Sequence, residues 1–218
     1  DGRRAGPTLT AIADVSITHL WDAIEAEFIR LHGRVAGGGT ALIAMGKFGG
    51  GELAHRSDID LVMVYDHEPD AEGSDGPKPL VPGLYFTRLA QRLIAGITAR
   101  TSEGRLYELD MRLRPSGRIV TAPESLRRSI ESIILESLTR KRDPEALVNE
   151  VASMRTRMAQ EHKGQSIWDI KHRRGGLVDI EFITQYLMLR HAAEHPDILN
   201  PNTAEALSGL VAAGVLDN

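Results

Sequence analysis

The chain contains no cysteine among its 218 residues, and only 5% of the residues are aromatic. Without cysteine it can form neither a disulfide bond nor a thiolate metal site, and it has no thiol nucleophile. Its longest apolar runs are too short to span a bilayer, and no signal-peptide pattern opens the sequence. We therefore expect a soluble, cytoplasmic protein with no membrane partner.

The sequence also lacks an excess of positive charge, since the net charge is -4 and the pI is about 6.1. This balance argues against broad, non-specific binding of nucleic acid, and we expect no nucleic-acid partner. Six arginines between Arg105 and Arg128 could still form a local basic patch, which would suit a triphosphate equally well. The length allows one good core or two small ones.

A pair of carboxylates opens a strand-like run, DIDLVMVY, at residues 58–65. Alternate residues of a strand share a face, so Asp58 and Asp60 point the same way, with Cα atoms roughly 6 to 7 Å apart. Two such carboxylates can hold two Mg²⁺ ions about 3.5 to 4 Å apart, an arrangement used in phosphoryl transfer. Taken alone, Asp-x-Asp more often marks a solvated strand edge or a turn.

A glycine-rich turn at residues 46–51 separates this run from an apolar strand at 41–45. Glycines let backbone N–H groups approach an anion closely, and Lys47 adds a point charge. If residues 51–56 form a short helix, its N-terminus offers a further phosphate seat. The spacing fits neither a P-loop nor a dinucleotide fingerprint. The candidate nucleotide-binding residues of this segment are Gly46, Lys47, Gly49, Gly50 and Ser57.

A second acidic strand is predicted from Leu106 to Arg114, where apolar and polar residues alternate strictly. An ordinary solvent-facing strand would alternate in the same way. If this strand pairs with the Asp58 strand, Asp110 approaches the metal pair, where it could bind a metal or accept the proton of an attacking hydroxyl. Arg112 and Arg114 would then reach the nucleotide phosphates.

Three regions are expected along the chain: an amphipathic helix with its linker at 1–36, a strand-containing domain at 37–122 and a helical domain at 123–218. Apolar spacing predicts a helix over 15–32, with Trp21 and Phe28 as core anchors. Residues 67–82 read as a mobile loop. Asp143 and Pro144 predict a helix start. The apolar stripe expected on that helix consists of Leu147, Val151, Met154 and Met158.

The segment KHRRGG at 171–176 and the following LVDIEF have two interpretations. In the structural one, a basic loop and a glycine turn precede a helix whose first-turn residues, Asp179 and Glu181, offset the helix dipole. In the functional one, the loop lies at the mouth of a cleft, where it could hold nucleotide phosphates or ribose. Residue chemistry alone favours the structural role.

Four strings carry a specific resemblance: GKFGGGELAHRSDIDLVMVYD, YFTRLAQRLI, ARTSEGRLYELDMRLRPSG and IKHRRGGLVDIEFITQYLMLRHAAEHPDIL. From about Thr40 onward the chain resembles bacterial glutamine-synthetase adenylyltransferases. Its sequence resembles their C-terminal, adenylylating half more closely than their N-terminal half. The resemblance implies an α+β fold, with a polymerase β-like nucleotidyltransferase domain followed by a helical bundle. It also implies that Asp58 and Asp60 bind metal and that Asp110 is the third acid.

The expected activity is transfer of AMP from ATP to a tyrosine of glutamine synthetase, with Mg²⁺ bound. One alternative is phosphorolytic removal of AMP, and another is a non-catalytic module that binds the PII signal protein. The presence of Asp58, Asp60 and Asp110 argues against the non-catalytic module. PII is expected to act through the full-length enzyme. Phe48 replaces a usual leucine and Gly51 a common basic residue. The family's Trp-rich helix is missing between Ile130 and Glu131, so the helical domain is expected to be incomplete.

Overall fold

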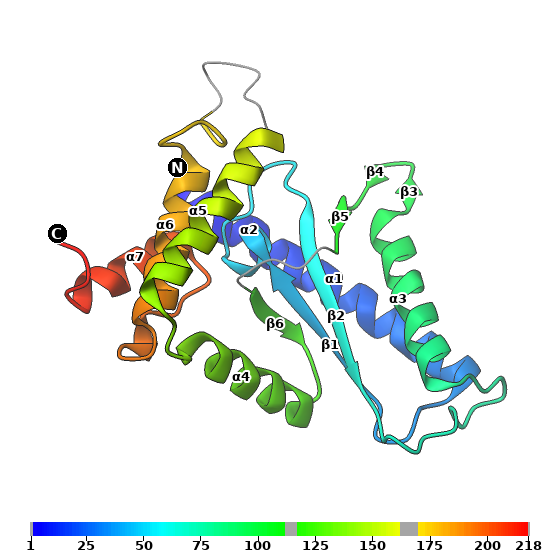
Figure 1. Cartoon of the computed structure of the whole chain (residues 1–218). Coiled ribbons are helices and arrows are strands. Elements are labelled where there is room, and N and C mark those ends of the chain that lie inside the picture. The colour runs from blue at the N-terminus through cyan, green and yellow to red at the C-terminus, as the bar shows by residue number, and fades with distance from the viewer. Residues whose placement is uncertain (1, 112–116, 162–169, 218) are drawn as a thin grey trace. The chain divides into compact units, whose positions relative to one another are not determined.

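A computed structural model describes residues 2–111, 117–161 and 170–217 of the chain (Figure 1). These residues divide into two compact units, 1–130 and 131–218, each with its own packing. Helices and a small mixed sheet together make the chain an α+β protein. None of the helices in the described ranges is both long enough and apolar enough to cross a membrane.

The first unit begins with a long helix and continues into a sheet. Its elements are α1 (Gly2–His32), β1 (Gly39–Met45), α2 (Gly46–Gly49), β2 (Ile59–Asp66), α3 (Pro82–Thr98), β3 (Arg100–Thr101), β4 (Gly104–Arg105), β5 (Leu109–Asp110) and β6 (Gly117–Thr121). Helix α4 (Glu124–Thr139) starts in this unit and ends in the next. The second unit continues with α5 (Pro144–Glu161), α6 (Leu177–His191), a 3-10 turn (Pro196–Ile198) and α7 (Thr203–Ala212).

The sheet has the order β5-β2-β1-β6. Strand β1 runs antiparallel to both β2 and β6, whereas β5 pairs with β2 in parallel. The strand expected over 106–114 is thus shorter within the described residues, where it is confined to Leu109–Asp110. The inward orientation expected for Tyr107 and Leu109 is confirmed, because both pack against the core.

Apolar side chains of β1 and β2 alternate between two cores, as the period of a strand requires. Leu42 and Ala44 of β1 join Ile59 and Leu61 of β2 in the core that α1 and α3 cover. The opposite face of β1 packs with the start of α4 around Ile130. Because β1 is buried on both faces, the position of the glycine turn that follows it is fixed.

Helix α1 is longer than its apolar pattern predicts. Trp21 and Phe28 are core anchors, as expected, with 2% and 1% of their surfaces exposed. The helix, however, begins at Gly2 rather than near Val15. Glycine and proline are poor helix formers, which hides residues 2–14 from a propensity argument. Packing overrides propensity there, since Thr10 and Ala13 are buried.

Residues 67–81 form a loop, as predicted, but this loop is tied to the end of α1. Gly76 N–H donates to the His32 carbonyl and Lys78 N–H to the Leu31 carbonyl, each at 3.0 Å. The carboxylate of Asp75 accepts from Arg34 N–H at 2.6 Å. These hydrogen bonds give the segment a definite conformation, in contrast to the expected mobility.

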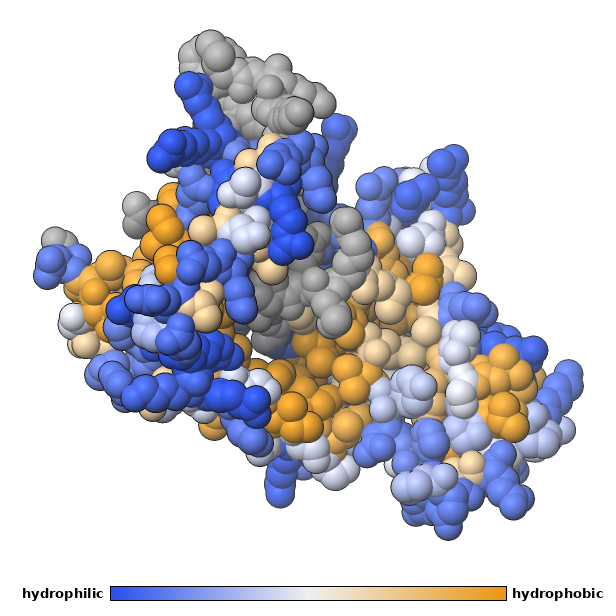
Figure 2. All heavy atoms as spheres, in the orientation of Figure 1, coloured by the Kyte–Doolittle hydropathy of each residue, from blue (hydrophilic) through white to orange (hydrophobic). Residues whose placement is uncertain are grey.

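Within the second unit, the predicted start of α5 is confirmed, because Asp143 Oδ1 accepts a hydrogen bond from Ala146 N–H at 2.7 Å. Of the expected apolar stripe, Leu147 is buried, but Met154 is 54% exposed, so its assignment to the core is wrong. A separate small core forms around Met188, Ile198 and Leu210. Figure 2 shows orange hydrophobic side chains at the surface over α6 and α7.

Candidate active site

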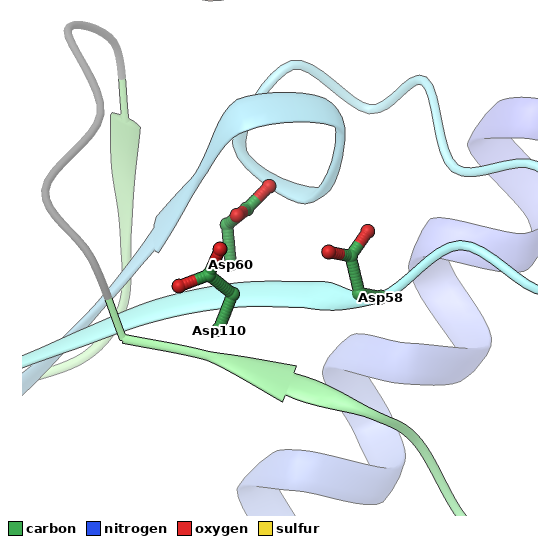
Figure 3. A group of neighbouring side chains, drawn as sticks. All are labelled: Asp58, Asp60 and Asp110. Atoms are coloured by element: carbon green, nitrogen blue, oxygen red, sulfur yellow. The ribbon is translucent and has the colours of Figure 1, made fainter. Parts of the chain in front are cut away.

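Three aspartates predicted to act together do lie together. Asp58 precedes β2, Asp60 lies on β2, and Asp110 lies directly beside Asp60 on β5 (Figure 3). One carboxylate oxygen from each residue can be chosen so that all three lie within 4.8 Å of one another. Asp60 is buried, Asp110 is half-buried and Asp58 is exposed, so the group opens toward solvent on one side.

The backbone explains why these carboxylates converge. Asp58 and Asp60 are two residues apart and therefore share a face of the strand. The parallel register pairs Ile59 with Leu109 and Asp60 with Asp110, which places the third carboxylate on that same face. Like charges at this separation repel one another. A hard divalent cation such as Mg²⁺ prefers oxygen ligands, and this donor set suits it.

The glycine turn lies against the acidic group. Gly46 has a φ of +52°, a left-handed conformation that favours glycine, and a Cβ there would lie 2.3 Å from Asp60 Oδ2. Gly49 packs against β1, where a Cβ would lie 2.6 Å from the Ala44 carbonyl oxygen. Both glycines are thus required by close packing, and Gly46 allows the turn to approach the candidate metal ligand.

The short helix considered for residues 51–56 does not form. The helical turn lies earlier, at Gly46–Gly49, and the chain then passes through Gly51 at φ +73° and Arg56 at φ +64°. A left-handed glycine ends a helix, so Gly51 limits the helical segment to the turn before it. A single turn has too few aligned peptides to provide the predicted phosphate seat of a helix N-terminus.

The remaining candidates differ in their surroundings. Gly50 N–H donates to the Gly46 carbonyl at 2.9 Å, which stabilises the turn itself. Lys47 is half-buried on this turn. Ser57 Oγ accepts from Ala54 N–H at 3.1 Å and so fixes the approach to β2. Arg112 and Arg114 lie outside the described residues.

In the second unit, Asp179 has the structural role that residue chemistry favours. Its carboxylate accepts a hydrogen bond from Gly175 N–H at 2.5 Å and pairs with Arg155 of α5. The Gly175 hydrogen bond, followed by the Arg155 hydrogen bond and charge, holds the pKa of Asp179 below its ordinary value, although partial burial opposes this shift. Asp179 therefore stabilises the N-terminus of α6 and links this helix to α5 through Arg155.

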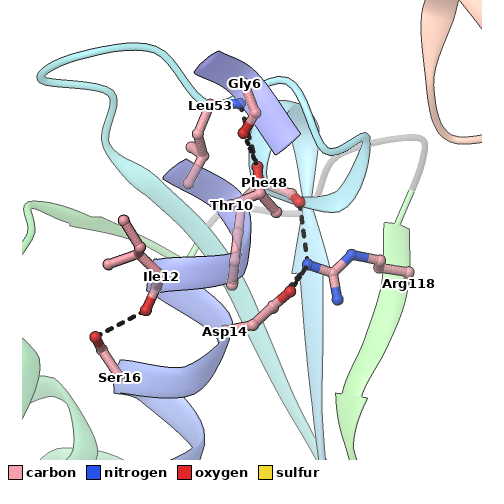
Figure 4. A network of polar contacts seen from close by, with 8 residues as sticks. All are labelled: Gly6, Thr10, Ile12, Asp14, Ser16, Phe48, Leu53 and Arg118. Carbon is pink, nitrogen blue, oxygen red and sulfur yellow. Dashed lines mark hydrogen bonds and ion pairs between the residues drawn. The ribbon is translucent and has the colours of Figure 1, made fainter. Parts of the chain in front are cut away.

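One contact beside the glycine turn has no signal in the sequence. Arg118 of β6 pairs with Asp14 of α1 and points at the carbonyl oxygen of Phe48 (Figure 4). The two charged residues are 104 positions apart, and neither belongs to a periodic pattern that would single it out. Only the tertiary structure reveals that the turn has this support.

A family model and individual similar proteins both assign the chain to the same family. The family model described as glutamate-ammonia ligase adenylyltransferase matches residues 5–129. Three similar proteins share the name "Bifunctional glutamine synthetase adenylyltransferase/adenylyl-removing enzyme". The one from Rhodopseudomonas palustris (strain ATCC BAA-98 / CGA009) is 38% identical over 98% of this chain and 25% of its own length. Those from Bradyrhizobium diazoefficiens and Xanthobacter autotrophicus are 40% and 35% identical over 95% and 100% of this chain.

The matched region is a limited part of those relatives, because the chain spans about a quarter of their length. The alignment with the Xanthobacter autotrophicus protein covers this whole chain of 218 residues yet extends over 249. That relative therefore carries residues within the aligned region that have no counterpart here.

Proposed function

We propose, since the chain belongs to the glutamate-ammonia ligase adenylyltransferase family, that it transfers AMP from ATP to a tyrosine hydroxyl of glutamine synthetase. The observation that carries this proposal is the group formed by Asp58, Asp60 and Asp110 beside a glycine turn. Carboxylates that can share a divalent cation support this proposal, as does a glycine turn whose backbone lies close to one of them.

In the proposed reaction, the tyrosine oxygen attacks the α-phosphorus of ATP, the bond to the bridging oxygen breaks and pyrophosphate leaves. Asp58, Asp60 and Asp110 would hold Mg²⁺, with two ions expected, and Asp110 would also accept the hydroxyl proton. Bound Mg²⁺ supplies neutralisation of the charge that develops on the phosphates. Catalysis rests on positioning, with no covalent enzyme intermediate.

The nucleotide is proposed to lie along the turn, because Gly46 brings the turn's backbone close to Asp60. Lys47 would supply a charge to the triphosphate, and Ser57 would line the approach to Asp58. Arg112 and Arg114 are proposed to bind phosphates with the two-pronged geometry of guanidinium groups.

The fold class is proposed to be that of the polymerase β-like nucleotidyltransferases, with the nucleotidyltransferase domain at 37–122 and a helical bundle at 123–218. A four-stranded mixed sheet with helices on its faces supports the first part. The PII signal protein is proposed as a regulatory partner of the longer enzyme.

Phosphorolytic removal of AMP is the second candidate, because the names of the relatives include an adenylyl-removing activity. The same carboxylates would serve it, with phosphate as the attacking group. The sequence segments LAQRL and ELDMRLRPSG resemble the adenylylating half of the family more closely and so favour the adenylylating direction.

A transfer assay separates the two directions. The chain should move label from α-labelled ATP, in the presence of Mg²⁺, to unmodified glutamine synthetase, and mass spectrometry should find AMP on tyrosine. Adenylylated synthetase with phosphate should release little ADP. If only ADP release occurs, the direction is wrong; if neither reaction occurs with folded protein, the proposed function fails.

A further inference from the structure

The glycine turn is held from outside by a charged pair. Arg118 Nη2 donates to both carboxylate oxygens of Asp14 at 2.7 Å and approaches the Phe48 carbonyl oxygen at 3.5 Å (Figure 4). The Arg118 guanidinium carbon also lies 5.2 Å from the centre of the Phe48 ring. Strand β6 thus presents one side chain that contacts both α1 and the turn.

Helix α1 contacts the far end of the same turn. Thr10 Oγ1 accepts a hydrogen bond from Leu53 N–H at 3.4 Å and donates to the Gly6 carbonyl at 2.9 Å. A Cβ on Gly6 would lie 3.2 Å from the Gly51 carbonyl oxygen, so the helix backbone approaches the turn closely. The segment from Phe48 to Leu53 is therefore held at one end by Arg118, which pairs with Asp14 of α1, and at the other end by α1 itself.

Small shifts of this turn would alter the acidic group directly. The ideal Cβ position of Gly46 lies only 2.3 Å from Asp60 Oδ2, so the turn packs directly against this carboxylate. In addition, the Phe48 carbonyl that Arg118 approaches already accepts Gly51 N–H at 3.3 Å. Arg118 therefore acts on a peptide group that takes part in the turn's own hydrogen bonding.

We propose that Asp14 and Arg118 are positioning residues, which hold the glycine turn in the conformation that binds the triphosphate of ATP. The proposal rests on the proposed function for its ligand, and it adds an ATP-affinity role for α1. Neither residue touches the nucleotide; each acts through the Phe48 peptide. An ion pair that served stability alone would leave ATP binding by the folded protein unchanged.

The test compares Arg118→Met, Asp14→Asn and the double variant with Arg118→Lys, which retains a charged donor. Arg30→Met is the matched control, because Arg30 pairs with Glu27 on the same helix at 2.7 Å without reaching the turn. Four quantities are measured on each variant: the KM for Mg·ATP, the KM for glutamine synthetase, amide hydrogen exchange at residues 50–52, and the melting temperature.

Arg118→Met and Asp14→Asn should each raise the KM for Mg·ATP about tenfold, because misplaced binding groups lose effective contacts. The KM for glutamine synthetase should not change, and exchange at 50–52 should accelerate. The double variant should resemble the single ones, since both side chains act through one contact. Arg118→Lys should recover most of the ATP affinity, and Arg30→Met should match the wild type.

Unchanged exchange at 50–52 in Arg118→Met overturns the proposal, as does a lower melting temperature with an unchanged KM for Mg·ATP. An equal rise of that KM in Arg30→Met would overturn it as well. Failure of the proposed function is distinguishable, because the wild type would then transfer no AMP. In that case the exchange rates still decide whether the pair holds the turn.

Discussion

The two compact units bury their apolar side chains in different ways. The first packs residues on both faces of a sheet, and side chains such as Leu42, Leu61 and Leu93 have no exposed surface. The second has a smaller core, while α4 exposes Ile133, Ile134 and Leu135 in succession, with Ile133 at 63%. A sheet fixes distances between strands through its backbone ladder, whereas a helix buries only a stripe. The three candidate metal-binding aspartates lie on or directly before strands of the sheet, where the hydrogen bonds between strands fix their distances.

The largest effect is expected from Asp60→Asn, which tests whether the chemistry belongs to the first unit. An amide binds Mg²⁺ weakly, so AMP transfer should fall by roughly two orders of magnitude or more. The melting temperature should not fall, because relief of repulsion among three carboxylates offsets lost contacts. Transfer assays and thermal melts check this, with Asp58→Asn as a companion. Near-normal turnover in a folded variant would contradict a metal role for the pair.

Core truncations compare the stability of the two units. Leu93→Ala in α3 and Leu210→Ala in α7 each remove a side chain with no exposed surface, so each should lower the free energy of unfolding by about 2 to 5 kcal/mol. Ile183→Ala on α6, where the side chain is 57% exposed, should change it by less than about 0.5 kcal/mol. Urea unfolding measures all three. A large loss in Ile183→Ala would mean that α6 has a partner on that face.

A pair of glycine substitutions separates backbone strain from damage to the site. Gly46 and Gly51 both have positive φ, so the backbone strain of alanine at either position should cost about 1 to 2 kcal/mol of stability. Only Gly46→Ala places a Cβ against Asp60, whereas a Cβ on Gly51 meets nothing within 4 Å. Gly46→Ala should therefore also abolish most AMP transfer. Equal activities in the two folded variants would contradict the role of the close approach.

The smallest effect concerns Asp179 in the second unit. Its lowered pKa means that it stabilises the fold above the ordinary aspartate pKa of about 3.9, and that this contribution is lost as the pH falls through the lower folded-state value. Asp179→Asn should reduce the free energy of unfolding at pH 7 by about 1 kcal/mol. Urea unfolding at pH 7 measures this loss, with Glu181→Gln as the control.

A carboxyl NMR titration tests the cause of that shift. Arg155→Met should raise the pKa of Asp179 only part of the way to its ordinary value, because the Gly175 N–H, the larger cause, still donates. A full return to the ordinary pKa in Arg155→Met would assign the shift to the ion pair alone.

Local features of the fold could be predicted from sequence because a few neighbouring residues encode them. Alternation of apolar residues predicts the inward faces of β2, and Asp143 before Pro144 predicts the start of α5. The predictions fail where packing overrides local preference. Helix α1 extends to Gly2 despite Pro7, and Met154 is exposed although its spacing matches a buried stripe.

The sequence by itself determined which carboxylates share a face, since Asp58 and Asp60 are two residues apart on one strand. Only the tertiary structure decided that β5 lies parallel to β2 with Asp110 beside Asp60, and that Asp14 meets Arg118 across 104 positions. The physical reason is the range of each interaction. Periodicity is set by backbone geometry within a few residues, whereas pairing between distant segments depends on how all the buried surfaces pack together.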